Sequence, residues 1–289
     1  MGKASVFQSL NTVNEYLKAA TQELRAVTDE RESQLEAELL LAFSLHKSRT
    51  WLKTWPEFQL TNGDDQLFCQ LIERRLTGEP LAYIIGSQDF WTFNLKVTQD
   101  TLVPRPETEL LVELALDKIP LEGDFNVADL GTGSGAIACA LGYERSQATV
   151  FAVDFSERAL AVAQQNVSSL SLDNVKCLQN SWLVNWQKGK LDLIVSNPPY
   201  VAEDDPHLKD LSFEPYSALV SQDNGYADIR IIAEQAKSIL TSKGYLMFEH
   251  GFEQAQTIQS ILQELGYVEI ETFQDLAGLD RVTIAQPAN

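Results

Sequence analysis

The sequence predicts an α/β protein in which a small N-terminal helical bundle precedes a doubly wound, mostly parallel sheet. Two observations predict it. The first eighty or so residues carry apolar positions at helical spacing without a strand signal, and from Pro104 on short apolar runs alternate with helical segments. Such alternation is typical of parallel βαβ units, whose helices cover both faces of one sheet. The length of 289 residues suits two domains, because one domain averages roughly 100–200 residues.

Three helices are expected in the N-terminal part. Apolar residues spaced by three or four positions predict a helix over 6–26, and the run LEAELLLAFSL predicts a second, more deeply apolar helix over 35–45. A third helix is expected over 64–76, where Gly78 supplies a stop signal. We therefore expect a helical bundle over residues 1–80.

A β-hairpin is expected to connect this bundle to the sheet, within a linker over 81–103. The apolar stretch begins at Tyr83, with the sequence YIIG. Further on, Phe93, Leu95 and Val97 alternate with polar residues, which is typical of a strand with one buried face.

Six short apolar runs are the expected strands of the α/β domain, which we place over 104–289. They are Val127–Leu130, Val150–Asp154, Leu191–Ser196, Gly244–Phe248, Tyr267–Ile270 and Arg281–Ala285. The first four are separated by helical segments, and the last two are closing strands. In a sheet of this kind, ligands bind at the carboxyl edge of the strands.

Composition and charge narrow the classes of partner. The net charge is −19, from 22 Lys and Arg against 41 Asp and Glu, and such acidity disfavours a nucleic-acid partner. No apolar run approaches the ~20 residues of a membrane span, and the N-terminus lacks signal-peptide features, so we expect a cytoplasmic protein without a membrane partner. The three cysteines and three histidines are scattered, which predicts neither disulfides nor a metal site.

A glycine-rich loop follows the first expected strand. Residues 127–130 run into Gly131-Thr132-Gly133-Ser134-Gly135, and a helix-like segment follows. Glycines allow the tight turn and close approach that a nucleoside cofactor requires. Asp154 ends the next strand, where a carboxylate can accept hydrogen bonds from ribose hydroxyls. The alternatives are a tight turn alone for the loop and a helix cap for Asp154. The GxGxG spacing departs from the GxGxxG of dinucleotide oxidoreductases.

The quartet Asn197-Pro198-Pro199-Tyr200 follows the expected strand over 191–196. Proline cannot continue a central strand, so the chain must leave the sheet at its carboxyl edge. The prolines make the segment stiff, and it offers two acceptors, the Asn197 side-chain oxygen and the Pro198 carbonyl. Two fixed acceptors suit a planar –NH2 group whose lone pair must be turned towards an electrophile. Tyr200 would stack on that group, although a proline-rich loop with a packed tyrosine is the simpler alternative.

Together, DLGTGSG, Asp154 and NPPY resemble class I methyltransferases that act on a planar amino group. Four further segments narrow the resemblance to the release factor glutamine methyltransferases, the PrmC/HemK family: GEPLAYIIG at 78–86, VPRPETE at 103–109, Glu214-Pro215, and FEHG at 248–251. The resemblance spans nearly the whole chain.

The resemblance implies a seven-stranded class I methyltransferase fold, S-adenosylmethionine as the cofactor, and the glutamine of the Gly-Gly-Gln loop of peptide chain release factors as the substrate. It implies a catalytic role for Asn197, Pro198 and Tyr200, and binding of the glutamine side chain by Asn197, Pro198, Pro199 and Tyr200. The implied cofactor contacts are Gly131, Thr132, Gly133, Ser134, Gly135, Asp154, Trp182 and Asn197. Core packing is an equal alternative for Trp182. Arg105 and Glu107 either order the loop at the mouth of the site or form a structural ion pair, and His250 is given no role.

Other functions stay open at this stage. The main alternative is an adenine-amino methyltransferase acting on DNA or RNA, because it uses the same quartet for the same reason. An inactive binding module and a dinucleotide oxidoreductase are less well supported. We expect a monomer in which the helical bundle docks the release factor, because selectivity for one glutamine requires contacts remote from the reacting nitrogen.

Overall fold

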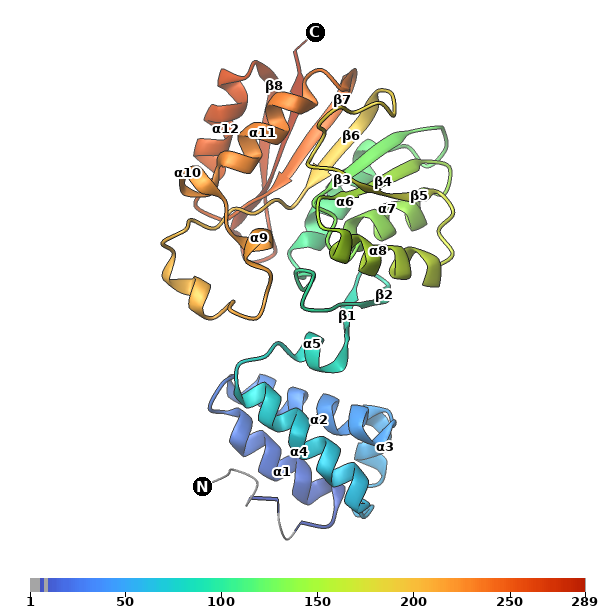
Figure 1. Cartoon of the computed structure of the whole chain (residues 1–289), viewed down its shortest axis with the longest axis vertical. Coiled ribbons are helices and arrows are strands. Elements are labelled where there is room, and N and C mark those ends of the chain that lie inside the picture. The colour runs from blue at the N-terminus through green and yellow to red at the C-terminus, as the bar shows by residue number, and fades with distance from the viewer. Residues whose placement is uncertain (1–5, 8–9, 289) are drawn as a thin grey trace. The chain divides into compact units, whose positions relative to one another are not determined.

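The computed structural model describes residues 6–7 and 10–288. The chain divides into two compact units, Met1–Gly86 and Ser87–Asn289 (Figure 1). The described apolar residues form one cluster in the first unit and two in the second. Each unit therefore has a hydrophobic core of its own.

The first unit is helical. Its elements are α1 Val13–Leu24, α2 Glu30–Leu45, α3 Arg49–Thr54, α4 Asn62–Leu76 and α5 Leu81–Ile85. The helix expected over 6–26 begins only at Val13, because Thr12 and Glu15 form a capping box. The second helix begins five residues earlier than expected, because the Asp29 side chain accepts from the backbone N–H groups of the first turn. The core joins these helices through aromatic contacts such as Tyr16 with Phe68, at 5.9 Å between ring centroids.

The expected strand signal at Tyr83 is wrong. Residues 83–85 lie in α5, which starts after Pro80 and ends at Gly86 with φ +82°. Ile84 packs in the helical core, so burial on one side of a helical turn explains the apolar run. The hairpin itself is confirmed, with β1 Ser87–Phe90 and β2 Phe93–Lys96 in antiparallel pairing.

The second unit contains a seven-stranded sheet of order β5-β4-β3-β6-β7-β9-β8. Its strands are β3 Asn126–Leu130, β4 Thr149–Asp154, β5 Val175–Gln179, β6 Leu191–Ser196, β7 Leu240–Glu249, β8 Tyr267–Gln274 and β9 Asp280–Pro287. The pairs from β5 to β7 are parallel, and β9 runs antiparallel to both its neighbours. The expected doubly wound, mostly parallel fold is confirmed. Strand β5 was not among the expected runs, because its sequence VKCLQ is short and mixes polar with apolar residues.

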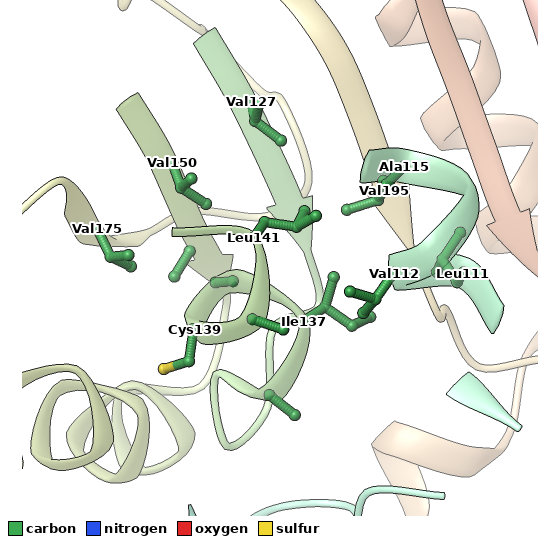
Figure 2. Close-up of a cluster of buried hydrophobic side chains, with 14 of the residues drawn as sticks. Leu111, Val112, Ala115, Val127, Ile137, Cys139, Leu141, Val150, Val175 and Val195 are labelled. Carbon is green, nitrogen blue, oxygen red and sulfur yellow. The ribbon is translucent and has the colours of Figure 1, made fainter. Parts of the chain in front are cut away.

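Helices cover both faces of this sheet. On one face α6 Thr108–Lys118, α7 Ala136–Glu144 and α8 Glu157–Ser169 contribute to a cluster that Figure 2 shows around Val127 and Ile137. On the other face α11 Ala227–Ala236 and α12 Ala255–Glu264 pack against a second cluster. Successive strand residues alternate between the faces, as Val127 and Ala128 do. The segment from β6 to α11 lies outside these layers and holds the 3₁₀ helix Pro206–Lys209, α9 Tyr216–Leu219 and α10 Gln222–Gly225.

Among the described residues, no helix is both long and apolar enough to span a membrane. The same residues contain no group of three or more His, Cys, Asp or Glu side chains that could hold a metal ion.

Candidate active site

A cavity of about 440 Å³ lies at the carboxyl edge of β3, β4 and β6. Its lining combines the segment before α6 (99–102), two glycines of the loop after β3, the end of β4 with the start of α8, residues 180–182, and residues of α9 and α11. Of the quartet after β6, Asn197 and Pro199 line the cavity, whereas Pro198 and Tyr200 are not among the lining residues. This volume falls in the range of roughly 300–1,000 Å³ typical of small-molecule sites. The cavity is therefore large enough for a nucleoside cofactor.

The glycine loop needs its glycines for different reasons. Gly131, Gly133 and Gly135 have φ values of +72°, +55° and +83°. A Cβ atom on Gly131 would lie 3.3 Å from the Trp182 ring, and one on Gly135 would lie 3.2 Å from Cβ of Ala163. A Cβ on Gly133 would meet no atom within 4 Å. Gly133 therefore borders the open cavity, while the other two allow close packing.

Thr132, Ser134 and Gly135 are not among the residues that line the cavity. The Thr132 hydroxyl donates to Oδ2 of Asp129 at 2.5 Å, and the Ser134 carbonyl accepts from the Asn166 amide at 2.8 Å. Both side chains are buried. They shape the loop, and any contact with a ligand is left to the backbone.

Asp154 faces the cavity from the end of β4. Its Oδ2 accepts from the Gly133 N–H and its Oδ1 from the Ser156 N–H, both at 2.9 Å. Each carboxylate oxygen can accept a second bond. Burial raises the pKa of this carboxyl group. The helix cap that was the alternative for Asp154 is supplied by Ser156, whose hydroxyl accepts from Ala159 N.

Trp182 both lines the cavity and packs against the core. Its backbone has φ +51°, and its ring lies against Gly131. The indole N–H donates to Oδ1 of Asp228 at 3.2 Å, and Oδ2 of Asp228 accepts from the Ser221 hydroxyl at 2.6 Å. Ser221 and Asp228 thus hold the wall formed by Trp182, and no sequence pattern predicts a role for either residue.

The quartet leaves the sheet directly beside the glycine loop. The Ser196 hydroxyl donates to the Leu130 carbonyl at 2.7 Å, which ties the ends of β6 and β3 together. Asn197 donates from Nδ2 to the Thr108 hydroxyl at 3.4 Å. Its Oδ1 is buried and has no hydrogen-bond partner. Buried acceptors are nearly always paired, so an unpaired one beside a cavity indicates a site for a donor.

Tyr200 is held through its backbone. Its carbonyl accepts from the Gln254 side chain at 3.0 Å, and a Cβ on Gly225 would lie only 2.1 Å from the same oxygen. Burial raises the pKa of Tyr200 to about 12. The phenol is therefore neutral near pH 7 and suits packing against a planar group, not proton transfer.

The open roles of Arg105 and His250 are decided by geometry. Arg105 pairs with the buried carboxylate of Glu214, which also accepts from the Val103 N–H at 3.0 Å. Arg105 therefore joins the segment before α6 to the loop after β6, as an ion pair. His250 is fully buried, bonds to the Thr283 hydroxyl at 2.8 Å, and has its pKa lowered by burial. Glu107 is exposed, and no contact gives it a role in the site.

The cavity wall is acidic. Asp100, Asp154 and Asp228 line it, whereas Arg158 is the one basic residue in the lining. A wall of this sign favours a positively charged ligand. The sequence analysis missed Asp100 and Asp228, because their distance from the glycine loop along the chain left no local signal.

Comparison with known proteins identifies the family. The model of the PrmC N-terminal domain matches residues 15–86, and that of the methyltransferase small domain matches residues 106–211. The release factor glutamine methyltransferase of Vibrio cholerae is 46% identical over 278 residues, covering 95% of this chain and 96% of that protein. That of Coxiella burnetii is 42% identical over 275 residues, covering 95% and 99%.

The chain belongs to the release factor glutamine methyltransferase family.

Solved structures agree with the fold of this family. The ribosomal protein L11 methylase from Lactobacillus delbrueckii subsp. bulgaricus has a TM-score of 0.51 at 20% identity, covering 70% of this chain and 92% of that chain. A methyltransferase from Pyrococcus furiosus has a TM-score of 0.53 at 16% identity, covering 75% and 98%. This family member therefore has the class I methyltransferase fold.

The cofactor of this family member is S-adenosylmethionine. The residues present fit it in three ways. The cavity has the volume of a nucleoside site, the surface of Gly133 is open, and the acidic wall suits a ligand that carries sulfonium and ammonium charges against one carboxylate.

Proposed function

We propose that this protein methylates the side-chain amide nitrogen of the glutamine in the Gly-Gly-Gln motif of peptide chain release factors, using S-adenosylmethionine. Its relatives, which are release factor glutamine methyltransferases, support the class of substrate. One observation on this chain carries the chemistry: a buried, unpaired side-chain oxygen on Asn197, at the edge of an acidic cavity, next to two prolines. That oxygen can accept an N–H bond from a primary amide.

Cofactor contacts are proposed for the residues that border the cavity. Asp154 would accept from the ribose hydroxyls with the second acceptor position of each oxygen. Trp182 would cover the adenine ring from the wall that Asp228 fixes. Gly131, Gly133 and Asn197 line the same cavity, and Thr132, Ser134 and Gly135 would contribute through their backbone.

The reacting nitrogen is a weak nucleophile, because its lone pair is delocalised into the adjoining carbonyl group. Bound S-adenosylmethionine supplies a methyl group on positively charged sulfur, which is an electrophile. Asn197 Oδ1 and the Pro198 carbonyl would accept the two N–H bonds and turn the lone pair towards that methyl carbon. Transfer would join the nitrogen to the methyl carbon while the sulfur leaves as a neutral thioether, and the methylated nitrogen would release one proton to water as the product leaves. Pro199 and Tyr200 would bind the flat face of the amide and exclude water.

The helical unit is proposed to dock the release factor. It has a core of its own, and its described surface exposes aromatic side chains, with Trp55 57% and Phe58 42% exposed. A glutamine side chain offers little surface, so contacts away from the reacting nitrogen must supply the selectivity.

Radiolabelled S-adenosylmethionine tests this proposal against the adenine-amino alternative. The purified protein is incubated with a purified release factor, with the same factor carrying Gln→Asn in its Gly-Gly-Gln motif, and with DNA and RNA. We expect label in the first sample alone. Label in nucleic acid, or equal label in the two release factors, would show the proposed substrate to be wrong.

A further inference from the structure

Asn197 has a buried acidic neighbour on the adjacent strand. Strands β6 and β7 are parallel and pair Ser196 with Phe248. The next residues along the two strands are Asn197 and Glu249, so the register brings their side chains to the same edge of the sheet. Thr108, in the first turn of α6, joins Asn197 and Glu249 in this polar group, because its hydroxyl accepts from Nδ2 of Asn197 at 3.4 Å.

Glu249 is 1% exposed, and its Oε2 has no hydrogen-bond partner. Burial raises the pKa of this carboxyl group to about 7, and the Thr108 hydroxyl and the Asn197 amide act in the opposite direction. Arg281 of β9 and Glu107 before α6 act on it from the other packed elements, with opposite effects. A buried carboxylate of this kind needs N–H or O–H donors, and Asn197 carries two.

We propose that Glu249 is a positioning residue that orients the Asn197 side-chain amide, with its nitrogen towards Thr108 and Glu249 and its oxygen towards the cavity. This inference deepens the proposed function, since it rests on Asn197 being the acceptor for the glutamine nitrogen. Glu249 itself is not among the residues that line the cavity. It acts through Asn197.

The orientation matters because the two ends of an asparagine amide have nearly the same shape and opposite hydrogen-bonding character. With the amide turned over, an –NH2 group would face the –NH2 group of the substrate, donor against donor. Thr108 alone does not prevent this, because a hydroxyl both donates and accepts. Above its pKa of about 7 Glu249 is a carboxylate, which only accepts hydrogen bonds and so selects the nitrogen.

The test is a double-mutant cycle between Asn197→Asp and Glu249→Gln in the full chain, read as the single-turnover rate of methyl transfer to a release factor. Asn197→Asp places two carboxyl groups side by side and should lower the rate about a hundredfold or more. Glu249→Gln alone should lower it about tenfold, because the glutamine can present either end. The double variant should be about tenfold faster than Asn197→Asp, since the new amide can donate to the new carboxylate.

Glu214→Gln is the matched control. It also removes the charge of a buried carboxylate near the quartet, but its contacts are Arg105 and Val103, so it should not rescue Asn197→Asp. In Glu249→Gln, the cofactor affinity measured by calorimetry and the unfolding temperature should both change little, because the role of Glu249 lies in the chemical step. If the parent protein is active and the rate losses of the two single variants simply multiply in the double variant, the proposal for Glu249 is overturned.

A second measurement tests the contact between Glu249 and Asn197 without requiring that release factors are the substrate. In ¹⁵N-labelled protein, the Asn197 side-chain amide signals are assigned by their loss in Asn197→Asp. Glu249→Gln should shift them, whereas Glu214→Gln should leave them in place. If the parent protein transferred no methyl group to release factors, the proposed function would fail, and these signals alone would decide the contact. Unshifted signals would rule the contact out.

Discussion

At the scale of single residues, the site is marked by polar atoms that the fold leaves unpaired. Among the described residues, the buried side-chain atoms without a partner are Asp129 Oδ1, Asn197 Oδ1, Glu249 Oε2 and Arg281 Nε. Asn197 and Glu249 follow paired positions of neighbouring strands. An unpaired buried group is costly, by roughly 1–3 kcal/mol. Of these four residues only Asn197 lines the cavity, so its unpaired oxygen is the one that indicates a ligand.

Asn197→Ala should lower the single-turnover rate of methyl transfer by roughly 10²–10³, the effect of losing one preorganised polar contact. The change also removes the Nδ2 donor from Thr108, so thermal unfolding should shift as well, and the rates are compared at a temperature where both proteins are folded. A rate within a few fold of the parent would show that the side-chain oxygen does not hold the reacting nitrogen.

Asp154→Ala should weaken cofactor binding by roughly 1.5–3 kcal/mol, the range for hydrogen bonds to a charged acceptor. Isothermal calorimetry measures this directly. Asp154→Asn is the matched comparison, because it keeps one acceptor oxygen for Gly133 or Ser156 and should lose less. Unchanged affinity in a folded Asp154→Ala protein would remove this residue from the cofactor site.

At the scale of elements, the quartet is stiff because other segments brace it. Its prolines restrict φ, but the direction of the segment depends on Gln254, which donates to the Tyr200 carbonyl at 3.0 Å and accepts from Gly251 N at 2.9 Å. Val201 continues the brace by pairing with Val220. The loop that carries Gly225 reaches the quartet with two left-handed residues, Asp223 and Asn224, before it.

Gly225→Ala should destabilise the protein by about 2 kcal/mol or more and lower the rate of methyl transfer. The position has φ +90° and no room for a Cβ beside the Tyr200 carbonyl, so backbone strain and a clash add. Gly63→Ala in α4 is the control, because its Cβ would meet only Thr61 Oγ1 at 4.0 Å and alanine favours the helix. Equal unfolding temperatures for the two variants would contradict the close approach.

At the scale of the whole molecule, two units with separate cores share the work proposed for the protein. The residues that line the cavity all belong to the unit from Ser87 on. The apolar cluster of the helical unit contains described residues from Phe7 to Ile85 only. Cofactor binding and substrate docking can therefore be separated by experiment.

A protein that begins at Ser87 should bind S-adenosylmethionine with near-normal affinity and methylate intact release factor poorly. Calorimetry measures the first property, and label transfer the second. A short Gly-Gly-Gln peptide should be a poor substrate for both forms, because neither gains docking contacts from it. A soluble truncated protein that methylates release factor at the full rate would show that the helices do not dock the substrate.

Buried acids should make stability depend on pH. Burial raises the pKa of Asp129 from 3.8 to about 7. Between these values the folded state binds more protons than the unfolded state. The contribution of Asp129 to the free energy of unfolding is therefore fully present below about pH 4 and is lost as pH rises to about 7. Asp129→Asn keeps an acceptor for Thr132 and Ala138. As pH rises from about 4 to about 7, the unfolding temperature of this variant should rise relative to that of the parent protein. A difference in unfolding temperature that stays constant over this window would contradict the shift.

Features set by local stereochemistry could be predicted from the sequence alone. The glycine loop, the acid at the end of β4 and the departure of the quartet from β6 follow from glycine, strand ends and proline. The six expected apolar runs all lie within strands of the structure, because short apolar runs between helical segments are typical of buried strands. Tyr83–Ile85 was misread because a short apolar run is compatible with a strand or a buried helical turn, and packing decides between them.

The tertiary structure decided which of these features meet. Trp182 bonds to a residue 46 positions away, Arg105 to one 109 positions away, and Asn197 to one 89 positions away. Such contacts depend on strand order and register, which the pattern of any single strand does not contain. The orientation proposed for the Asn197 amide also depends on tertiary structure. The nitrogen and the unpaired oxygen of this amide are distinguished only by their neighbours on β7 and α6.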